Sequence, residues 1–261
     1  MQFLLYLYNS KQEVNMNKTV KILLIASLVG NCAIFYVANK ALEYRRHINH
    51  FLYKYRNVSE EFSGRNIFQD ENQPFISDTT VNNRIIFFGT QVTAKYDVKK
   101  YYPEYDALNR GIEGQKVAGF LLRFKPDVLD LAPKAVILEI SSYNLRAETS
   151  IKEIEDYTIL LTQLSRYNNI RPILTTIIKP RHEFEDVVEI KELDDYNVFD
   201  SVDTYNNWLR NYAQNEKIAL VDFAKILGDS EQFLRVDCSD NLVEPNEIGY
   251  SLITEAIKEN L

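Results

Sequence analysis

The fold of this chain is decided by residues 84–93, which read RIIFFGTQVT. The run of apolar residues from Ile85 to Phe88 is β-branched or aromatic and predicts a short strand buried on both faces. Gly89 ends the run, as glycine does where a chain turns sharply or a ligand comes close. In a parallel sheet such a turn lies at the carboxyl edge, where α/β proteins place their sites. An ordinary core strand with an ordinary turn is the alternative.

Strands and helices alternate after this stretch. We expect strands at 106–109, 135–140, 172–178 and 218–221, and helices at 115–124, 151–167, 202–213 and 246–257, with a turn through Pro126. Alternation of this kind implies a parallel sheet covered by helices on both faces. The predicted fold class is therefore α/β, a flavodoxin-like three-layer α/β/α sandwich.

Three further blocks accompany residues 88–93. Residues 109–115 read NRGIEGQ, residues 142–144 read SYN after an apolar run, and residues 241–246 read NLVEPN. In order and spacing these four blocks resemble the SGNH (GDSL-type) esterase and acyl-hydrolase family, over about residues 84–261. The resemblance implies the same three-layer fold. In that family a serine in the first block attacks an ester, and a histidine and an aspartate in the last block activate it.

The residues at the triad positions of this chain are Gln91 for the serine, Asn241 for the aspartate and Glu244 for the histidine. An amide is not a nucleophile, and Asn241 lacks the charge that stabilises an imidazolium. Gly111 and Asn144 match the positions that supply the family's oxyanion hole, so a pocket for a carbonyl or hydroxyl oxygen is one expectation. The other is structural, with Gly111 in a tight turn and Asn144 tying two loops together.

Other residues are candidates to replace the lost chemistry. Thr90 lies beside the nucleophile position, Ser141 and Ser142 precede Asn144, and Glu244 is able to act as a general base on water. Tyr96 and Tyr143 are candidates for a sugar-binding surface. The only histidines are His47, His50 and His182, and none occupies the family position.

The segment before these blocks contains a candidate membrane anchor. Residues 1–21 form a leader in which Met1 or Met16 is the start, and residues 22–38 are almost entirely apolar after Lys18 and Lys21. Seventeen residues reach about 26 Å as a helix, close to the hydrocarbon thickness of a bilayer. We expect a single-pass anchor; a cleaved signal peptide is the competing interpretation.

The side of the membrane on which the domain lies is left open. Basic residues after the apolar run outnumber those before it and favour a cytoplasmic domain, whereas anchored members of the family are commonly exported.

Residues 39–57 predict an amphipathic stalk helix, with Leu42, Ile48, Phe51, Leu52 and Tyr55 at helical spacing. This helix is expected to hold the domain away from the bilayer or to pack against another protein. Residues 58–83 are rich in polar turn formers and predict an extended linker, which leaves 84–261 as the hydrolase-like domain.

Composition excludes some partners and cofactors. Residues 1–80 carry 9 basic and 7 acidic groups, and residues 81–261 carry 21 and 30, so the domain is acidic and we expect no nucleic-acid binding. Cys32 and Cys238 are expected to be inert thiols. Residues 183–195 hold seven acids and one lysine, which we interpret as a solvated loop and not a metal site. No metal or cofactor is predicted.

Three functions follow from these observations. The first is a membrane-anchored SGNH-fold protein without catalysis that binds a ligand or partner, with a glycan or an acylated molecule as the expected ligand. The second is an active esterase, acetyl-hydrolase or O-acyltransferase with a rebuilt site. The third is a structural protein whose stalk helix recruits another membrane protein.

Overall fold

The computed structural model describes residues 17–59, 64–76, 78, 81–145, 149–183 and 198–261. The chain divides into two compact units, Met1–Glu60 and Glu61–Leu261, and each is described separately below. The predicted leader lies mostly outside the described residues, as do residues 184–195 of the acidic run.

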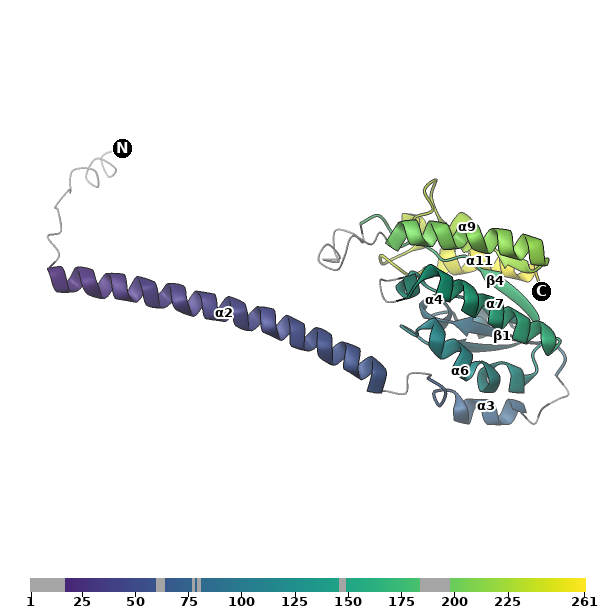
Figure 1. Ribbon diagram of the computed structural model, residues 1–261. Coiled ribbons are helices and arrows are strands. Elements are labelled where there is room, and N and C mark those ends of the chain that lie inside the picture. The colour runs from purple at the N-terminus through teal and green to yellow at the C-terminus, as the bar shows by residue number, and fades with distance from the viewer. Residues whose placement is uncertain (1–16, 60–63, 77, 79–80, 146–148, 184–197) are drawn as a thin grey trace. The chain divides into compact units, whose positions relative to one another are not determined.

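The described residues of the first unit form the helix α2 (Lys18–Ser59), 42 residues long (Figure 1). It covers both the apolar run at 22–38 and the predicted stalk at 39–57 without a break. Within the described residues this is a helix long and apolar enough to cross a membrane, although a signal sequence near an N-terminus has the same properties. The helical prediction for both segments is therefore confirmed.

The second unit is built on a five-stranded parallel sheet with strand order β2-β1-β3-β4-β5. The strands are β1 (Arg84–Gly89), β2 (Asp106–Gly111), β3 (Ala135–Leu138), β4 (Arg171–Thr175) and β5 (Ala219–Val221). The chain reverses its direction of winding between β1 and β3, where doubly wound folds place their ligands. This topology confirms the flavodoxin-like three-layer prediction.

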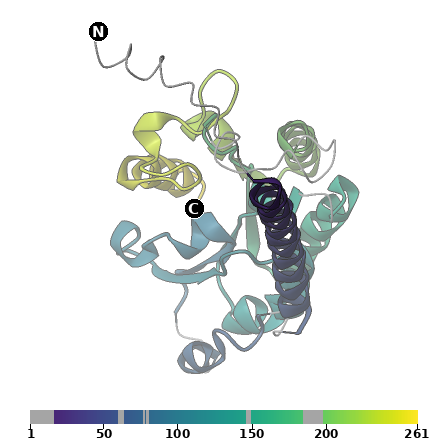
Figure 2. The same cartoon turned by 90° about the vertical axis from the view of Figure 1, so that its left-hand side faces the viewer.

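Helices cover the sheet on both faces (Figure 2). One face packs on α6 (Val117–Asp127), α7 (Ile151–Tyr167) and α9 (Val198–Glu216). The other packs on the short helices α4 (Gln91–Ala94), α5 (Val98–Tyr101) and α10 (Phe223–Leu227) and on α11 (Glu247–Lys258). Single turns of 3-10 helix lie at η1 (Leu129–Leu131), η2 (Ser142–Leu145) and η4 (Val236–Cys238).

The buried residues of β1 explain why this stretch organises the domain. Ile86 and Phe88 face the α6, α7 and α9 layer, while Ile85 and Phe87 face the opposite layer, and each has 1% of its surface exposed or less. A strand with an apolar residue on both faces at every position is stable only between two covering layers. The continuous apolar run in the sequence thus reports the three-layer architecture.

Several predicted boundaries were wrong by a few residues. β3 ends at Leu138 and β4 at Thr175, before the predicted ends at 140 and 178, since the chain turns away there at the carboxyl edge. α6 continues through Pro126, where we predicted a turn; the carbonyl of Pro126 accepts a hydrogen bond from Asn72 at 3.1 Å.

The extended linker predicted for 58–83 is wrong for part of its length, because α3 (Gln69–Ile76) forms there. Asn72 of α3 is buried and donates to Asp127 at 2.7 Å, while its oxygen accepts from Arg110 at 2.8 Å. Polar composition suggested a solvated segment, but these side chains bind buried charges of the domain. The boundary between the two units accordingly lies at Glu60 and not near residue 83.

Candidate active site

The turn after β1 is held by a buried carboxylate, Glu139, directly after β3. Thr90 donates its backbone N–H at 2.7 Å and its hydroxyl at 2.9 Å, and the Thr93 hydroxyl donates at 2.9 Å. A Cβ on Gly89 would lie 2.5 Å from Glu139 Oε2 and 2.3 Å from Thr93 Oγ1. Gly89 is therefore required because the carboxylate occupies the space that a side chain would need.

Burial raises the pKa of the Glu139 carboxyl, against the opposing effect of the Thr90 and Thr93 hydrogen bonds. The carboxyl has a structural role, since its oxygens are occupied by the turn of the first block. Sequence analysis missed Glu139; the signal was a single acid in the apolar run AVILEI at 135–140.

The three triad positions lie together. Gln91, the first residue of α4, donates its Nε2 to Glu244 Oε1 at 2.7 Å. Asn241 donates its Nδ2 to the other oxygen of Glu244 at 3.0 Å. The Asn241 side-chain oxygen in turn accepts the backbone N–H of Glu244 at 2.8 Å, which fixes the loop. The fold thus keeps the geometry of a hydrogen-bonded triad, with an amide, a carboxylate and an amide in its three positions.

The loop that carries Asn241 and Glu244 is anchored by α11. Asn246 caps this helix by accepting from the N–H groups of Ile248 and Gly249, both at 3.1 Å. The Ser239 hydroxyl donates to the carbonyl of Glu244 at 2.7 Å. The last block therefore presents Glu244 from a loop fixed at both ends.

The two predicted oxyanion-hole residues have internal partners. The Gly111 N–H donates to the Asn109 side chain at 2.8 Å, and a Cβ on Gly111 would lie 2.3 Å from the backbone nitrogen of Ala94. Asn144 is fully buried; it donates to the carbonyl of Gln115 at 3.1 Å and accepts from the N–H of Val117 at 2.9 Å. Both residues therefore have structural roles, Gly111 in a tight turn and Asn144 in a link between two loops. Ligand binding by either residue stays a prediction.

Gly114, the second glycine of the same block, was not selected from the sequence. It is exposed, has φ +71°, and has no atom within 4 Å of a Cβ built on it. This backbone is open to the approach of a ligand, in contrast to that of Gly111. The spacing of two glycines in NRGIEGQ was the available signal.

The proposed substitute nucleophiles are not joined to Glu244. Thr90 is fully buried and its hydroxyl is used by Glu139. Ser142 is partly buried in η2, and within the described part of the chain no hydrogen bond links it to Gln91, Asn241 or Glu244. The Ser141 carbonyl accepts the N–H of Asn144 at 3.0 Å. Of the residues suggested as substitutes for the family's catalytic groups, Glu244 is the one that hydrogen-bonds to Gln91 and Asn241.

The sugar-binding candidate Tyr96 and the histidine His182 both lie away from the triad positions. Tyr96, suggested as a sugar-binding residue, is only 4% exposed, and its hydroxyl contacts those of Tyr102 and Thr254 in the core. His182 is exposed; its Nε2 lies 3.1 Å from an oxygen of Asp229 and its ring stacks on Phe233. The Tyr96 prediction was wrong because the tyrosine-rich layer under α11 is core.

Arg123 of α6 forms hydrogen bonds with the backbone of both the first and the second block. It is fully buried, donates to the carbonyls of Gly89 at 3.2 Å and Arg110 at 2.9 Å, and pairs with Asp127 at 3.0 Å. Burial lowers the pKa of Arg123 to about 10, so the guanidinium stays protonated at neutral pH. The turn at Gly89 is therefore held by Arg123 and Glu139, which favours a rigid site.

Charged side chains of both signs lie near Glu244. Lys95 lies 3.1 Å from Glu113, and this carboxylate, with a smaller contribution from Glu244, raises the pKa of the Lys95 ammonium. Among the described residues no group of three or more His, Cys, Asp or Glu side chains is arranged to hold a metal ion. The site is thus built from amides, carboxylates and an ammonium.

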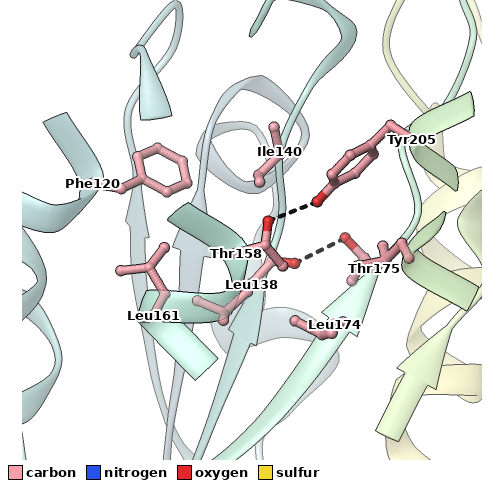
Figure 3. A pocket seen from close by; sticks show the side chains of 9 residues that line it. Phe120, Leu138, Ile140, Thr158, Leu161, Leu174, Thr175 and Tyr205 are labelled. Atoms are coloured by element: carbon pink, nitrogen blue, oxygen red, sulfur yellow. Dashed lines mark hydrogen bonds between the residues drawn. The ribbon is translucent and has the colours of Figure 1, made fainter. Parts of the chain in front are cut away.

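A small internal cavity lies between the sheet and helices α7 and α9 (Figure 3). Thr158 and Tyr205 share a hydrogen bond of 2.8 Å beside it, and the Thr175 hydroxyl donates to the carbonyl of Leu138 at 3.1 Å. Every hydroxyl drawn there has a protein partner, and the lining is otherwise apolar. We interpret this cavity as a packing defect of the core, separate from the site.

A five-stranded parallel sheet with the order β2-β1-β3-β4-β5, covered by helices on both faces, defines an α/β protein of the flavodoxin-like class. The model of the GDSL-like lipase/acylhydrolase family matches residues 87–252, more than half of the chain. The chain belongs to this family.

Solved structures share the fold. A GDSL-like lipase from Bacteroides thetaiotaomicron is 23% identical, with a TM-score of 0.67 over 77% of this chain and 98% of that one. An acetyl xylan esterase is 20% identical, with a TM-score of 0.54 over 68% of this chain and 99% of that one. An acetyl-xylooligosaccharide esterase variant from a Geobacillus species is 16% identical, with a TM-score of 0.52 over 69% and 94%. No curated protein matches the chain.

Proposed function

We propose that this chain is a membrane-anchored GDSL-fold protein whose family site binds a ligand without hydrolysing it. The observation that carries the proposal is the Gln91–Glu244–Asn241 chain of hydrogen bonds, at 2.7 and 3.0 Å. The positions that would attack an ester, take its proton and orient the base are joined as in a triad, but the first holds an unreactive amide. Three hydrogen-bonded side chains without a nucleophile among them suit the binding of a ligand better than its hydrolysis.

The availability of donors points the same way. Acyl transfer needs fixed N–H groups aimed at the developing oxyanion. Gly111 and Asn144 hold the family positions for this task. The Gly111 N–H donates to the side chain of Asn109. The Asn144 amide donates to the carbonyl of Gln115 and accepts the N–H of Val117. Because the Gly111 N–H is already hydrogen-bonded and Asn144 is fully buried, these two residues are poorly placed to stabilise an anionic intermediate.

The ligand that we propose is a glycan, with or without acyl groups. Side chains of Gln91, Asn241, Glu244 and Lys95 supply both donors and acceptors, which suit the hydroxyl groups of a sugar. Two of the structural neighbours are described as an acetyl xylan esterase and an acetyl-xylooligosaccharide esterase. Those descriptions motivate the choice of probe.

The experiment combines binding and turnover on one sample. The domain from residue 61 onward would be mixed with acetylated and deacetylated xylo-oligosaccharides, with binding followed by ligand-observed NMR and acetate release measured in parallel. We expect binding that weakens in Gln91→Ala and Asn241→Ala but not in Gln73→Ala, an exposed position on α3, and no acetate above the blank. Rapid acetate release by the unmodified domain would refute the proposal; absence of binding would refute the glycan ligand alone.

A second candidate function is supported by the same 2.7 Å contact. Glu244 would take a proton from water while that water attacks an ester carbonyl, and the Gln91 amide would donate to the oxyanion. When the tetrahedral intermediate collapses, the alcohol leaves and receives the proton that Glu244 took from water. If a sugar hydroxyl attacks in place of water, the acyl group is transferred to the sugar. This function requires turnover that disappears in Glu244→Gln, whereas the binding function does not.

A further inference from the structure

Glu244 is a half-buried carboxylate that is held by neutral groups. One of its oxygens accepts the Gln91 amide at 2.7 Å, and the other accepts the Asn241 amide at 3.0 Å. Among the ion pairs that the described residues form, none includes Glu244. Amide donors orient a carboxylate but do not cancel its charge. The family site of this chain therefore carries a negative charge in a fixed position, where the family has a histidine.

Lys95 adds a positive charge near Glu244, but Glu113 already neutralises it. The Lys95 ammonium lies 3.1 Å from Glu113, which is the main cause of the raised pKa of Lys95, and Glu244 contributes less. One ammonium and two carboxylates leave one negative charge in excess. The unit Glu61–Leu261 adds to this field, since it carries 22 basic and 34 acidic groups. The local and the overall charge thus both attract a cationic group.

The hydrogen-bonding capacity of Glu244 indicates which cationic group fits. A carboxylate accepts about four hydrogen bonds, so two remain beside those from the amides. An ammonium group offers three N–H donors, and a charge-assisted hydrogen bond is about twice as strong as a neutral one. A metal ion such as Ca²⁺ fits less well, since it takes about six to eight oxygen ligands. The described residues hold no group of three or more His, Cys, Asp or Glu side chains suited to a metal.

We propose that the ligand of this site is an amino sugar with a free amino group, and that the ammonium of this sugar pairs with Glu244. The inference rests on the proposed function, because it names the chemical class of ligand that the same site binds. Gln91 donates to Glu244 through its Nε2, and its Oε1 accepts a hydroxyl of the same sugar. Acetylation of the amine removes the charge and leaves a single N–H donor, so the site discriminates against N-acetylated sugars.

The test compares two disaccharides that differ only in acetylation. The full-length chain, in a non-ionic detergent without sugar groups, would be titrated with chitobiose, a disaccharide of glucosamine, and with N,N′-diacetylchitobiose. Saturation-transfer NMR would measure both affinities at about pH 6, where an amine of this kind is protonated. We expect chitobiose to bind about tenfold tighter, and this preference to shrink at about 0.5 M salt.

Three variants separate the contact with Glu244 from the general charge of the chain. Glu244→Gln removes the charge at nearly the same shape, and the tenfold preference should disappear. Glu153→Gln removes an exposed carboxylate from α7, outside the site, and should keep the preference. Lys95→Gln should raise the affinity for chitobiose roughly two- to threefold, because an opposing charge is lost. An increase of this kind cannot come from a misfolded variant.

The outcomes distinguish this inference from the proposed function. Equal binding of the two disaccharides, binding of neither, or a preference that survives Glu244→Gln would overturn the inference. Each of these results, obtained while xylo-oligosaccharides bind without being hydrolysed, would leave the proposed function intact. Rapid acetate release from acetylated xylo-oligosaccharides would refute the proposed function, and it is measured by a separate signal.

Discussion

Glu139 holds the conformation of the turn that follows β1. Its carboxyl accepts from Thr90 and Thr93, and Gly89 leaves it the space to do so. We expect Glu139→Ala to destabilise the domain by roughly 2–4 kcal/mol, because buried N–H groups lose their partner and a cavity forms. Urea unfolding would measure the loss, with the exposed Glu153→Ala on α7 as a control that changes little.

The pH dependence of stability should also identify Glu139. Its pKa is raised by burial in the folded state, so its contribution to stability is fully present below the unfolded pKa of ~4.3 and is lost as pH rises through the folded pKa. Glu139→Gln keeps the shape and removes the titration. The unfolding free energy of the wild type minus that of Glu139→Gln should therefore fall as pH rises from about 4. A difference independent of pH would contradict the assigned direction.

Restoring the triad tests whether the three positions are still placed for chemistry. Gln91→Ser, Glu244→His and Asn241→Asp together should react with a fluorophosphonate roughly 10²–10⁴ times faster than Gln91→Ser alone, since the base and its orienting partner activate the serine. The existing distances of 2.7 and 3.0 Å motivate this expectation. Labelling of the unmodified protein would show instead that a nucleophile is present, and mass spectrometry would locate it.

At the scale of elements, α3 is the part that the sequence misrepresented. Its residues, QDENQPFI, are mostly polar, and no periodicity separates such a helix from a linker. Its role becomes visible only with two buried arginines, Arg84 on β1 and Arg110 on β2, which lie over the rings of Phe75 and Phe68. Buried arginines need partners, and those partners come from a segment distant in sequence.

The strands, by contrast, were predictable. β1 and β3 are buried on both faces, so their apolar runs are continuous and report the parallel sheet directly. The four blocks likewise fixed which residues would meet at the triad. The sequence could not reveal which groups accept the hydrogen bonds that Gly111 and Asn144 donate. Their partners come from adjoining loops, and the conformation of those loops depends on packing. The short helices α4, α5 and α10 were missed for the same reason.

Helix α3 provides a direct prediction. Asn72→Leu should destabilise the domain by about 2–4 kcal/mol, because Asp127 and Arg110 each lose a buried hydrogen bond. Gln73→Ala, on the exposed side of the same helix, should change stability by less than about 0.5 kcal/mol. Deleting residues 1–60 should leave a folded domain, and deleting 1–83 should not. A stable, soluble fragment 84–261 would contradict the assignment of α3 to the domain.

At the scale of the whole molecule, the charge and the apolar residues are divided between two units. The first, Met1–Glu60, has an excess of five basic groups, and the second, Glu61–Leu261, an excess of twelve acidic ones. Helix α2 exposes the apolar residues of its first half to the surroundings. An exposed apolar run of this length is typical of a segment that inserts into a bilayer, as an anchor or as a signal sequence.

The last prediction is that residues 22–38 remain in the mature protein as an anchor. With a C-terminal tag, the full-length chain should stay in the membrane fraction through high salt and carbonate and be released only by detergent, because hydrophobic insertion is insensitive to salt. The variant lacking residues 1–60 should be soluble and serves as the control. Sequencing of the N-terminus separates the two interpretations of α2: a mature start between residues 38 and 60 would show a cleaved signal peptide.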